Sequence, residues 1–159
     1  MTRRGIPLNQ KGSVYRTCVQ SVMVYASETW VVRVEEEQRM ERNENVMLRW
    51  MCGVTLRDKV PTEELRRRLG IEGVMEVRRR GRLRWFGHVE RKEVDDACRN
   101  LEVVGSRGRG RPRMIWRARL DGDMKDVGLR PEMAMDREKW RCGIMGSTSD
   151  PHKRGNNGL

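Results

Sequence analysis

The apolar residues of this chain recur at spacings of three and four within segments that glycine or proline bounds. That spacing places them on one side of an α-helix, whereas a half-buried strand would alternate apolar and polar residues. No stretch of the sequence shows such alternation, and none repeats another. The pattern therefore predicts an all-α protein with a small helical bundle, then an Arg/Gly-rich linker and short C-terminal helices.

Six segments carry the helical pattern. The expected helices cover residues 14–30, 35–52, 62–69, 73–92, 113–127 and 131–141. Gly53 and Gly70 should end the second and third helices, and Thr62 is the candidate N-cap of the third. The predicted organisation is an extended lead (1–13), a helical domain (14–104), the Arg/Gly linker (105–113), a short helical segment (114–142) and a disordered tail (143–159).

The chain is strongly basic, and the excess charge is concentrated in its middle third. It has 159 residues and a formal net charge of +11, and 28 of its 34 basic residues are arginine. Residues 61–120 hold 17 basic against 9 acidic side chains. A guanidinium binds phosphate through a planar fork and stacks on bases, so this excess favours RNA or DNA as the partner. A coding sequence rich in G and C would also raise the arginine content.

Other partners find little support in the sequence. No apolar run approaches the roughly 18 residues that a membrane-spanning helix needs, and no apolar signal-peptide core follows Met1. The acid-free residues 1–27 superficially resemble a transit peptide, but Pro7 and two glycines interrupt any amphipathic helix there. We expect an intracellular protein, nuclear or cytoplasmic, with no membrane partner and no small-molecule substrate.

The cysteines and histidines do not form a metal or cofactor motif. Cys18, Cys52, Cys98 and Cys142 lie 34 to 46 residues apart, far from the two-to-four-residue spacing of zinc sites. We expect them to be reduced, small core residues, and His88 to be packed within its apolar helix. A phosphate-binding loop or dinucleotide fingerprint is absent as well. The sequence therefore predicts no cofactor and no metal.

Two arginine clusters are candidate nucleic-acid contacts. The first is expected on the outward side of the helix over 73–92 and comprises Arg78, Arg79, Arg80, Arg82 and Arg84. The second alternates with Gly, Ser and Pro and comprises Arg107, Arg109, Arg111 and Arg113. Its Arg-Gly-Arg-Pro core is typical of a hook that lies in the narrow minor groove of A·T-rich duplex. A flexible linker that makes unspecific RNA or DNA contacts is the other interpretation.

Six motifs along the chain point to one family. They are Lys-Gly-Ser-Val-Tyr-Arg (11–16), Tyr-Ala-Ser-Glu-Thr-Trp (25–30), Met-Leu-Arg-Trp-Met-Cys-Gly (47–53), Arg-Leu-Arg-Trp-Phe-Gly-His (82–88), Gly-Arg-Gly-Arg-Pro-Arg (108–113) and Asp-Arg-x-x-Trp-Arg (136–141). Together they resemble the C-terminal region of the reverse transcriptase of non-LTR, LINE-type (RTE-like) retrotransposons, over roughly residues 6–151. Ala26 departs from the glycine usual in the second motif.

The resemblance implies the thumb and post-polymerase region, which grips template and primer. A polymerase needs clustered carboxylates to hold two metal ions, and the only Asp pair, Asp95-Asp96, lies in a polar stretch without flanking apolar strands. We expect a truncated fragment without palm or endonuclease, not an enzyme, with at most electrostatic RNA or DNA binding. The alternative is a domesticated chromatin or DNA-binding module that uses the Arg109-Gly110-Arg111-Pro112 arm.

Overall fold

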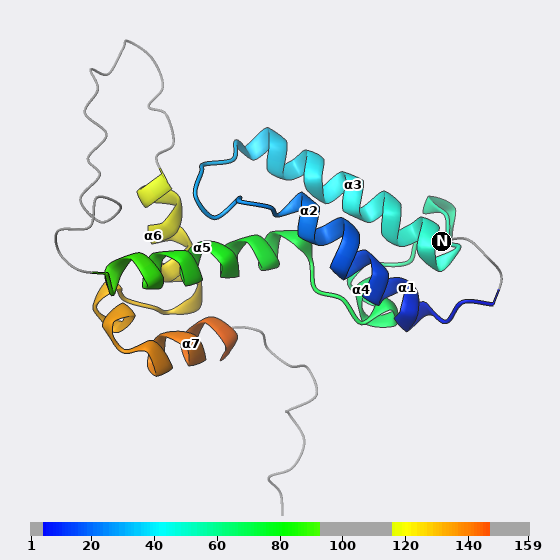
Figure 1. Ribbon diagram of the computed structural model, residues 1–159. Coiled ribbons are helices and arrows are strands. Elements are labelled where there is room, and N and C mark those ends of the chain that lie inside the picture. The colour runs from blue at the N-terminus through cyan, green and yellow to red at the C-terminus, as the bar shows by residue number, and fades with distance from the viewer. Residues whose placement is uncertain (1–4, 93–115, 147–159) are drawn as a thin grey trace, which may run out of the picture. The chain divides into compact units, whose positions relative to one another are not determined.

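The computed structural model describes residues 5–92 and 116–146, and within these ranges the protein is all-α, as the sequence predicts (Figure 1). The chain divides into an N-terminal unit, residues 1–82, and a C-terminal unit, residues 83–159. This division differs from the predicted helical domain over 14–104. Each unit has its own apolar core. In the described part of the chain, no helix is long and apolar enough to cross a bilayer.

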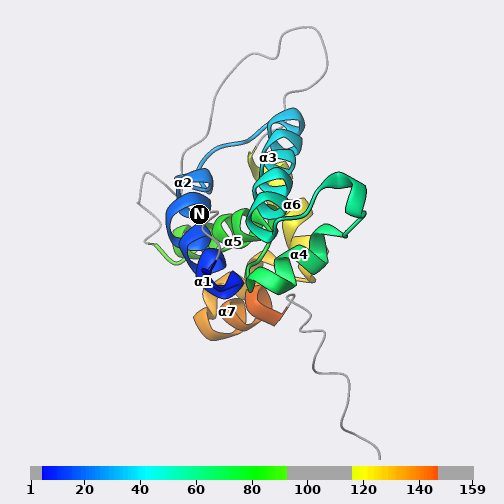
Figure 2. The same ribbon diagram turned by 90° about the vertical axis from the view of Figure 1, so that its right-hand side faces the viewer.

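The N-terminal unit is built from helices around one core. A continuous helix comprises α1 (Leu8–Val14), a π-helical stretch (Tyr15–Gln20) and α2 (Ser21–Met23). After it come α3 (Val34–Cys52), a 3-10 turn (Leu56–Asp58), α4 (Thr62–Leu69) and the first part of α5 (Val74–Glu90). Helices α1, α3 and α4 contact one another, and Figure 2 shows them side by side.

The first helix begins earlier than predicted, so the expected extended lead over residues 1–13 is wrong from Leu8 onward. Pro7 precedes the helix with φ −57° and ψ 146°, a conformation suited to a helix start. Gly12, which suggested an extended segment, is instead buried, and a Cβ there would overlap the carbonyl of Leu69 at the end of α4. Gly12 thus lets two helices approach closely.

The π-helical stretch explains why the expected buried stripe in the first helix is wrong. Tyr15 and Gln20 are both buried at a spacing of five residues, which the wider turn of a π-helix, with its i→i+5 hydrogen bonds, brings to a similar side. At the α-helical period, the spacing of Cys18 and Val22 in the sequence predicts that both lie on the buried side of the first helix, but both are exposed. The helix also ends at Met23 and not near residue 30.

The ends of α3 and α4 follow the predicted glycines. Gly53 and Gly70 adopt left-handed conformations with φ of 67° and 64°, which glycine adopts without steric cost. The first turn of α4 differs from prediction, because Pro61 is the N-cap and Thr62 is already helical. The core of this unit consists of Tyr15, Leu48, Met51, Leu65, Leu69 and Ile71, and Cys52 packs partly buried against it.

The C-terminal unit contains the last part of α5, α6 (Trp116–Val127), a 3-10 turn (Pro131–Met135) and α7 (Arg137–Gly146). A single helix over 131–141 was expected, but Asp136 interrupts it with φ −88° and ψ 102°. Its carboxylate accepts hydrogen bonds from the N–H groups of Glu138 and Lys139, both at 3.1 Å, which starts α7 anew. Helix α7 reaches Gly146, so residues 143–146 are not part of a disordered tail. The linker over 105–113 and residues 147–159 lie outside the described residues.

The core of the C-terminal unit centres on Trp140, whose indole N–H donates to the carbonyl of Leu83 at 2.9 Å. Gly87 permits this approach, because a Cβ there would overlap the Trp140 ring. The ring of Phe86 lies 5.7 Å from Trp140. The remaining buried members are Leu120, Met124, Leu129, Ala134 and Ile144.

Two predicted core positions of this unit are wrong. His88 is exposed, because the buried side of α5 here is defined by Leu83, Phe86 and Gly87, and its ring lies 5.8 Å from that of Trp85. Cys142 is exposed as well, since Trp140 and Ile144 take the buried side of α7.

The close approach of α1 and α4 yields a first prediction. Replacing Gly12 by Ala should destabilise the protein by about 1–3 kcal/mol, because the added methyl overlaps the Leu69 carbonyl. The control is Gly122→Ala in α6, where nothing lies within 4 Å of a Cβ, and it should stabilise by about 0.5–1 kcal/mol through helix propensity. Urea unfolding followed by circular dichroism measures both. Equal and favourable effects would contradict the close approach.

Candidate functional site

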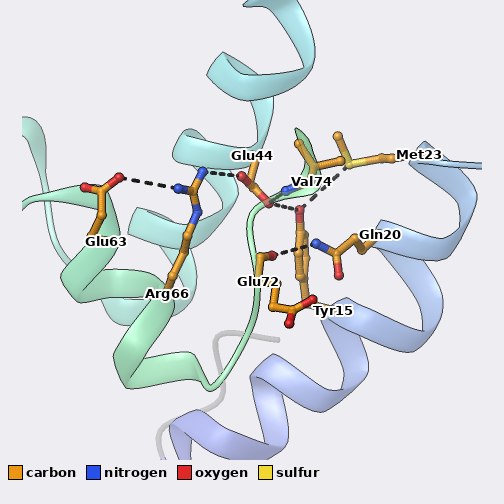
Figure 3. A network of polar contacts seen from close by, with 8 residues as sticks. All are labelled: Tyr15, Gln20, Met23, Glu44, Glu63, Arg66, Glu72 and Val74. Carbon is orange, nitrogen blue, oxygen red and sulfur yellow. Dashed lines mark hydrogen bonds and ion pairs between the residues drawn. The ribbon is translucent and has the colours of Figure 1, made fainter. Parts of the chain in front are cut away.

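A buried carboxylate, Glu44 of α3, gathers polar groups from three other segments of the N-terminal unit (Figure 3). Its side chain has no solvent exposure. One oxygen accepts hydrogen bonds from the Tyr15 hydroxyl at 3.3 Å and from the backbone N–H of Val74 at 2.9 Å. The other oxygen pairs with the Arg66 guanidinium at 2.7 Å. Glu44 therefore ties the first helix, α4 and the start of α5 to α3.

The groups around Glu44 are themselves held in place. Arg66 also faces Glu63 at 3.4 Å and packs over Gly73, where a Cβ would come within 2.9 Å of the guanidinium carbon. The buried Gln20 side chain donates to the backbone carbonyl of Glu72 at 2.8 Å. These contacts fix the loop that connects α4 to α5, as Figure 3 shows.

This network is suited to structure and not to catalysis. Both oxygens of Glu44 are occupied by protein donors, and no solvent reaches them, so a substrate has no access. Burial, together with the neighbouring Glu44 charge, raises the pKa of Tyr15 above its ordinary value. The sequence did hold a signal for Glu44, since it precedes Leu48 and Met51 by four and seven residues on the buried side of α3.

The arginines of α5 do not form the predicted outward cluster. Arg78 and Arg82 are buried, with only 1% and 2% of their surface exposed, although they were expected outside. Arg78 lies 3.4 Å from the carboxylate of Glu37, which is itself buried on α3. The carboxylate of Glu37 on the facing helix explains the burial of Arg78, because a guanidinium tolerates burial only when it is paired.

The next two arginines of α5 pair with carboxylates close in sequence. Arg79 lies 2.6 Å from Glu76, and Arg80 lies 3.0 Å from Glu72. Both side chains are largely shielded, whereas Arg84 is exposed. Of the five arginines predicted on the outward side of this helix, only Arg84 is therefore exposed and able to contact an external phosphate freely.

The remaining predicted sites fall outside the residues described. Arg107, Arg109, Arg111 and Arg113 belong to that part of the chain, as do Asp95 and Asp96. Among the described residues, no group of three or more His, Cys, Asp or Glu side chains is arranged to hold a metal ion.

A shallow cleft of about 480 Å³ lies beside the π-helical stretch. Arg16 and Glu72 give its wall opposite charges, and Gln20, which also lines it, already donates to the Glu72 carbonyl. The cleft therefore lacks the convergent unpaired polar groups of a small-molecule site.

No family model matches the chain, and no curated protein or solved structure is significantly similar to it. The class of the protein is therefore defined by its own architecture. It is an all-α protein with two separately packed units, the first organised around a buried carboxylate.

The buried carboxylate yields a second prediction. Glu44→Gln should destabilise the N-terminal unit by about 3 kcal/mol, because Arg66 loses its closer, buried partner and the amide cannot accept all three hydrogen bonds. Glu41→Gln is the matched control, since Glu41 is exposed on the same helix and should change stability by less than about 0.5 kcal/mol. Chemical denaturation of both variants measures the difference. Two equally mild effects would show that the network contributes little.

A third prediction concerns alkaline pH. The pKa of Tyr15 is raised in the folded state, so the stability gained from its neutral phenol is present below the unfolded value of about 10 and is lost as pH rises above it. Tyr15→Phe should therefore flatten the loss of stability above that pH. The only other tyrosine, Tyr25, is 79% exposed, and Tyr25→Phe should leave the alkaline limb unchanged. Thermal melting across a pH series distinguishes the two variants.

Proposed function

We propose that this chain derives from the C-terminal region of a LINE-type reverse transcriptase and binds RNA or DNA through its basic side chains without polymerase chemistry of its own. The observation that carries the proposal is the placement of the motifs on which the resemblance rests. Their residues supply much of the packing in both units.

In the N-terminal unit, residues from two of the motifs lie in the same core. Gly12 and Tyr15 belong to the first motif, and Leu48 and Met51 belong to the third. Gly12 sets the distance between α1 and α4, and Tyr15 donates to the buried Glu44. Motif positions that pack against one another support a resemblance of fold, and not a coincidence of separate short peptides.

In the C-terminal unit as well, residues from two of the motifs lie in one core. Leu83, Phe86 and Gly87 come from the fourth motif, and Trp140 comes from the last. Trp140 follows Leu83 by 57 positions and Phe86 by 54, yet these residues form the central contact of the core. Such long-range agreement is what a family fold would require.

The net charge of the chain indicates the class of ligand. The carboxylates of the described residues are not arranged as a metal site. A net charge of +11 favours a polyanion, and contacts to phosphate would make the affinity depend on salt. A domesticated DNA-binding module with a minor-groove hook at Arg109 to Pro112 is the alternative. It requires that A·T-rich duplex compete better than G·C-rich duplex.

A fourth prediction tests the arm. Changing Arg107, Arg109, Arg111 and Arg113 together to Ala should remove about four phosphate contacts and flatten the slope of log affinity against log salt on duplex DNA by about 3 to 4 units. Changing the same four to Lys keeps the charge and should keep most of the slope. Fluorescence anisotropy over a salt series measures both variants.

Three outcomes would contradict the proposal in different ways. An unchanged slope in the alanine variant would remove the arm from the binding surface. A preference for A·T-rich duplex that is lost in the lysine variant would favour the minor-groove alternative. Template-directed nucleotide incorporation by the purified chain would contradict the absence of polymerase chemistry.

A further inference from the structure

The outward side of α3 differs in charge from that of α4, where the exposed arginines are paired with a carboxylate. At 3.6 residues per turn, the buried residues Glu37, Glu44, Leu48 and Met51 define one side of this helix. The opposite side carries five exposed residues between Gln38 and Cys52, which we call the α3 face. They are Arg39, Arg42, Asn43, Val46 and Trp50.

The arginines of the α3 face have no carboxylate partner within the described residues. By contrast, the α4 pair Arg67 and Arg68 lies 2.7 and 2.9 Å from Glu64, and hydrogen bonds from Arg67 and then Arg68 lower the pKa of that carboxyl to about 2. The guanidinium groups of Arg39 and Arg42 are therefore available to an external anion, whereas Arg67 and Arg68 share the carboxylate of Glu64.

One carboxylate of α3, Glu35, lies on the same side one turn before Arg39, but it makes no ion pair with that arginine among the described residues. Glu35 and Glu36 are in the first turn, where they favour the positive end of the helix dipole, and the Glu36 side chain accepts the backbone N–H of Arg33 at 3.0 Å. Glu41 is exposed but lies about 140° around the helix from Val46. From Gln38 onward the α3 face is thus free of negative charge.

The α3 face also presents an aromatic ring to solvent. Trp50 is 54% exposed, and Val46, one turn earlier on the same side, is 68% exposed. An exposed aromatic ring on the same side of a helix as unpaired arginines matches the combination that binds single-stranded nucleic acid. In that combination, bases stack on the ring and guanidinium groups contact phosphates.

We propose that the α3 face binds a single-stranded segment of RNA or DNA, with an unpaired base stacked on Trp50 and phosphates held by Arg39 and Arg42. The two arginines lie about 16 and 12 Å from Trp50 along the helix axis, so the strand runs along α3 toward its N-terminus. The inference rests on the proposed function for the chemistry of the ligand. It places part of the binding on a surface that the arginine arm does not include.

The experiment compares variants of the full chain in binding a labelled oligothymidylate or oligouridylate. Trp50→Ala should weaken binding by about 5- to 100-fold, and Trp50→Phe should restore most of it, because any aromatic face can stack. Arg39→Gln with Arg42→Gln should flatten the salt slope by roughly 1.4 units on a single strand. A comparison of the two oligonucleotides shows whether the strand is RNA or DNA.

The matched control removes the same charge from α4. Arg67→Gln with Arg68→Gln lowers the net charge by two, as the α3 pair does, but these arginines are already paired with Glu64. This control should bind nearly as tightly as the unmodified chain. If both double variants weaken binding equally, net charge and not the α3 face determines affinity, and the inference is wrong.

Further outcomes separate this inference from the proposed function. If Trp50→Ala weakens binding to blunt duplex as much as to single strands, stacking on an unpaired base is refuted. A change in oligomeric state of Trp50→Ala by sedimentation, with binding unchanged, would assign the face to a second copy of the chain. If the α3 variants bind normally while the arm variant does not, the inference fails and the proposed function stands. Failure of the unmodified chain to bind any nucleic acid would overturn both.

Discussion

The N-terminal unit depends on one buried charge. Glu44 has no exposure and makes contacts with Tyr15, Arg66 and Val74, which come from segments far apart in the sequence. A buried carboxylate is unfavourable unless its oxygens are paired, so these segments must meet in one arrangement for the charge to be accommodated. Apolar contacts alone would tolerate small rotations of the helices. The carboxylate makes the arrangement specific, and Gly12 and Gly73 supply the room that it requires.

The arginines that the structure describes fall into two groups, those paired with carboxylates and those without such a partner. In α4 and α5 most arginines neutralise carboxylates within the fold, such as Arg78 against Glu37 and Arg66 against Glu44. On the outward side of α3, arginines have no such partner in the described part of the chain. An overall charge of +11 therefore does not indicate where a polyanion binds, because many of the positive groups form ion pairs within the fold. The distribution of carboxylates, and not of arginines, is what separates structural from available charge.

The sequence predicted the all-α class and the bounds of α3 and α4 closely, because apolar periodicity and terminal glycines act locally. It failed where long-range packing decides. Arg78 and Arg82 looked like a solvated basic stripe, since Glu37 on another helix was not seen as the partner of Arg78. Cys18 looked buried because an α-helical period was assumed where the helix is π. The local α-helical periodicity of a sequence reveals neither a carboxylate that is distant along the chain nor a π-helical turn.

The two polar contacts of the first helix depend on the π-helical period of its middle stretch. This stretch lets Tyr15 reach Glu44 while Gln20, five residues on, reaches the carbonyl of Glu72. If the same residues were α-helical, five steps of about 100° would turn Gln20 about 140° around the helix from Tyr15. Only one of the two contacts could then survive. Homologous chains that keep both polar contacts should therefore either keep the π-helical turn or have one residue fewer between the two side chains, because an α-helix brings positions four apart to the same side.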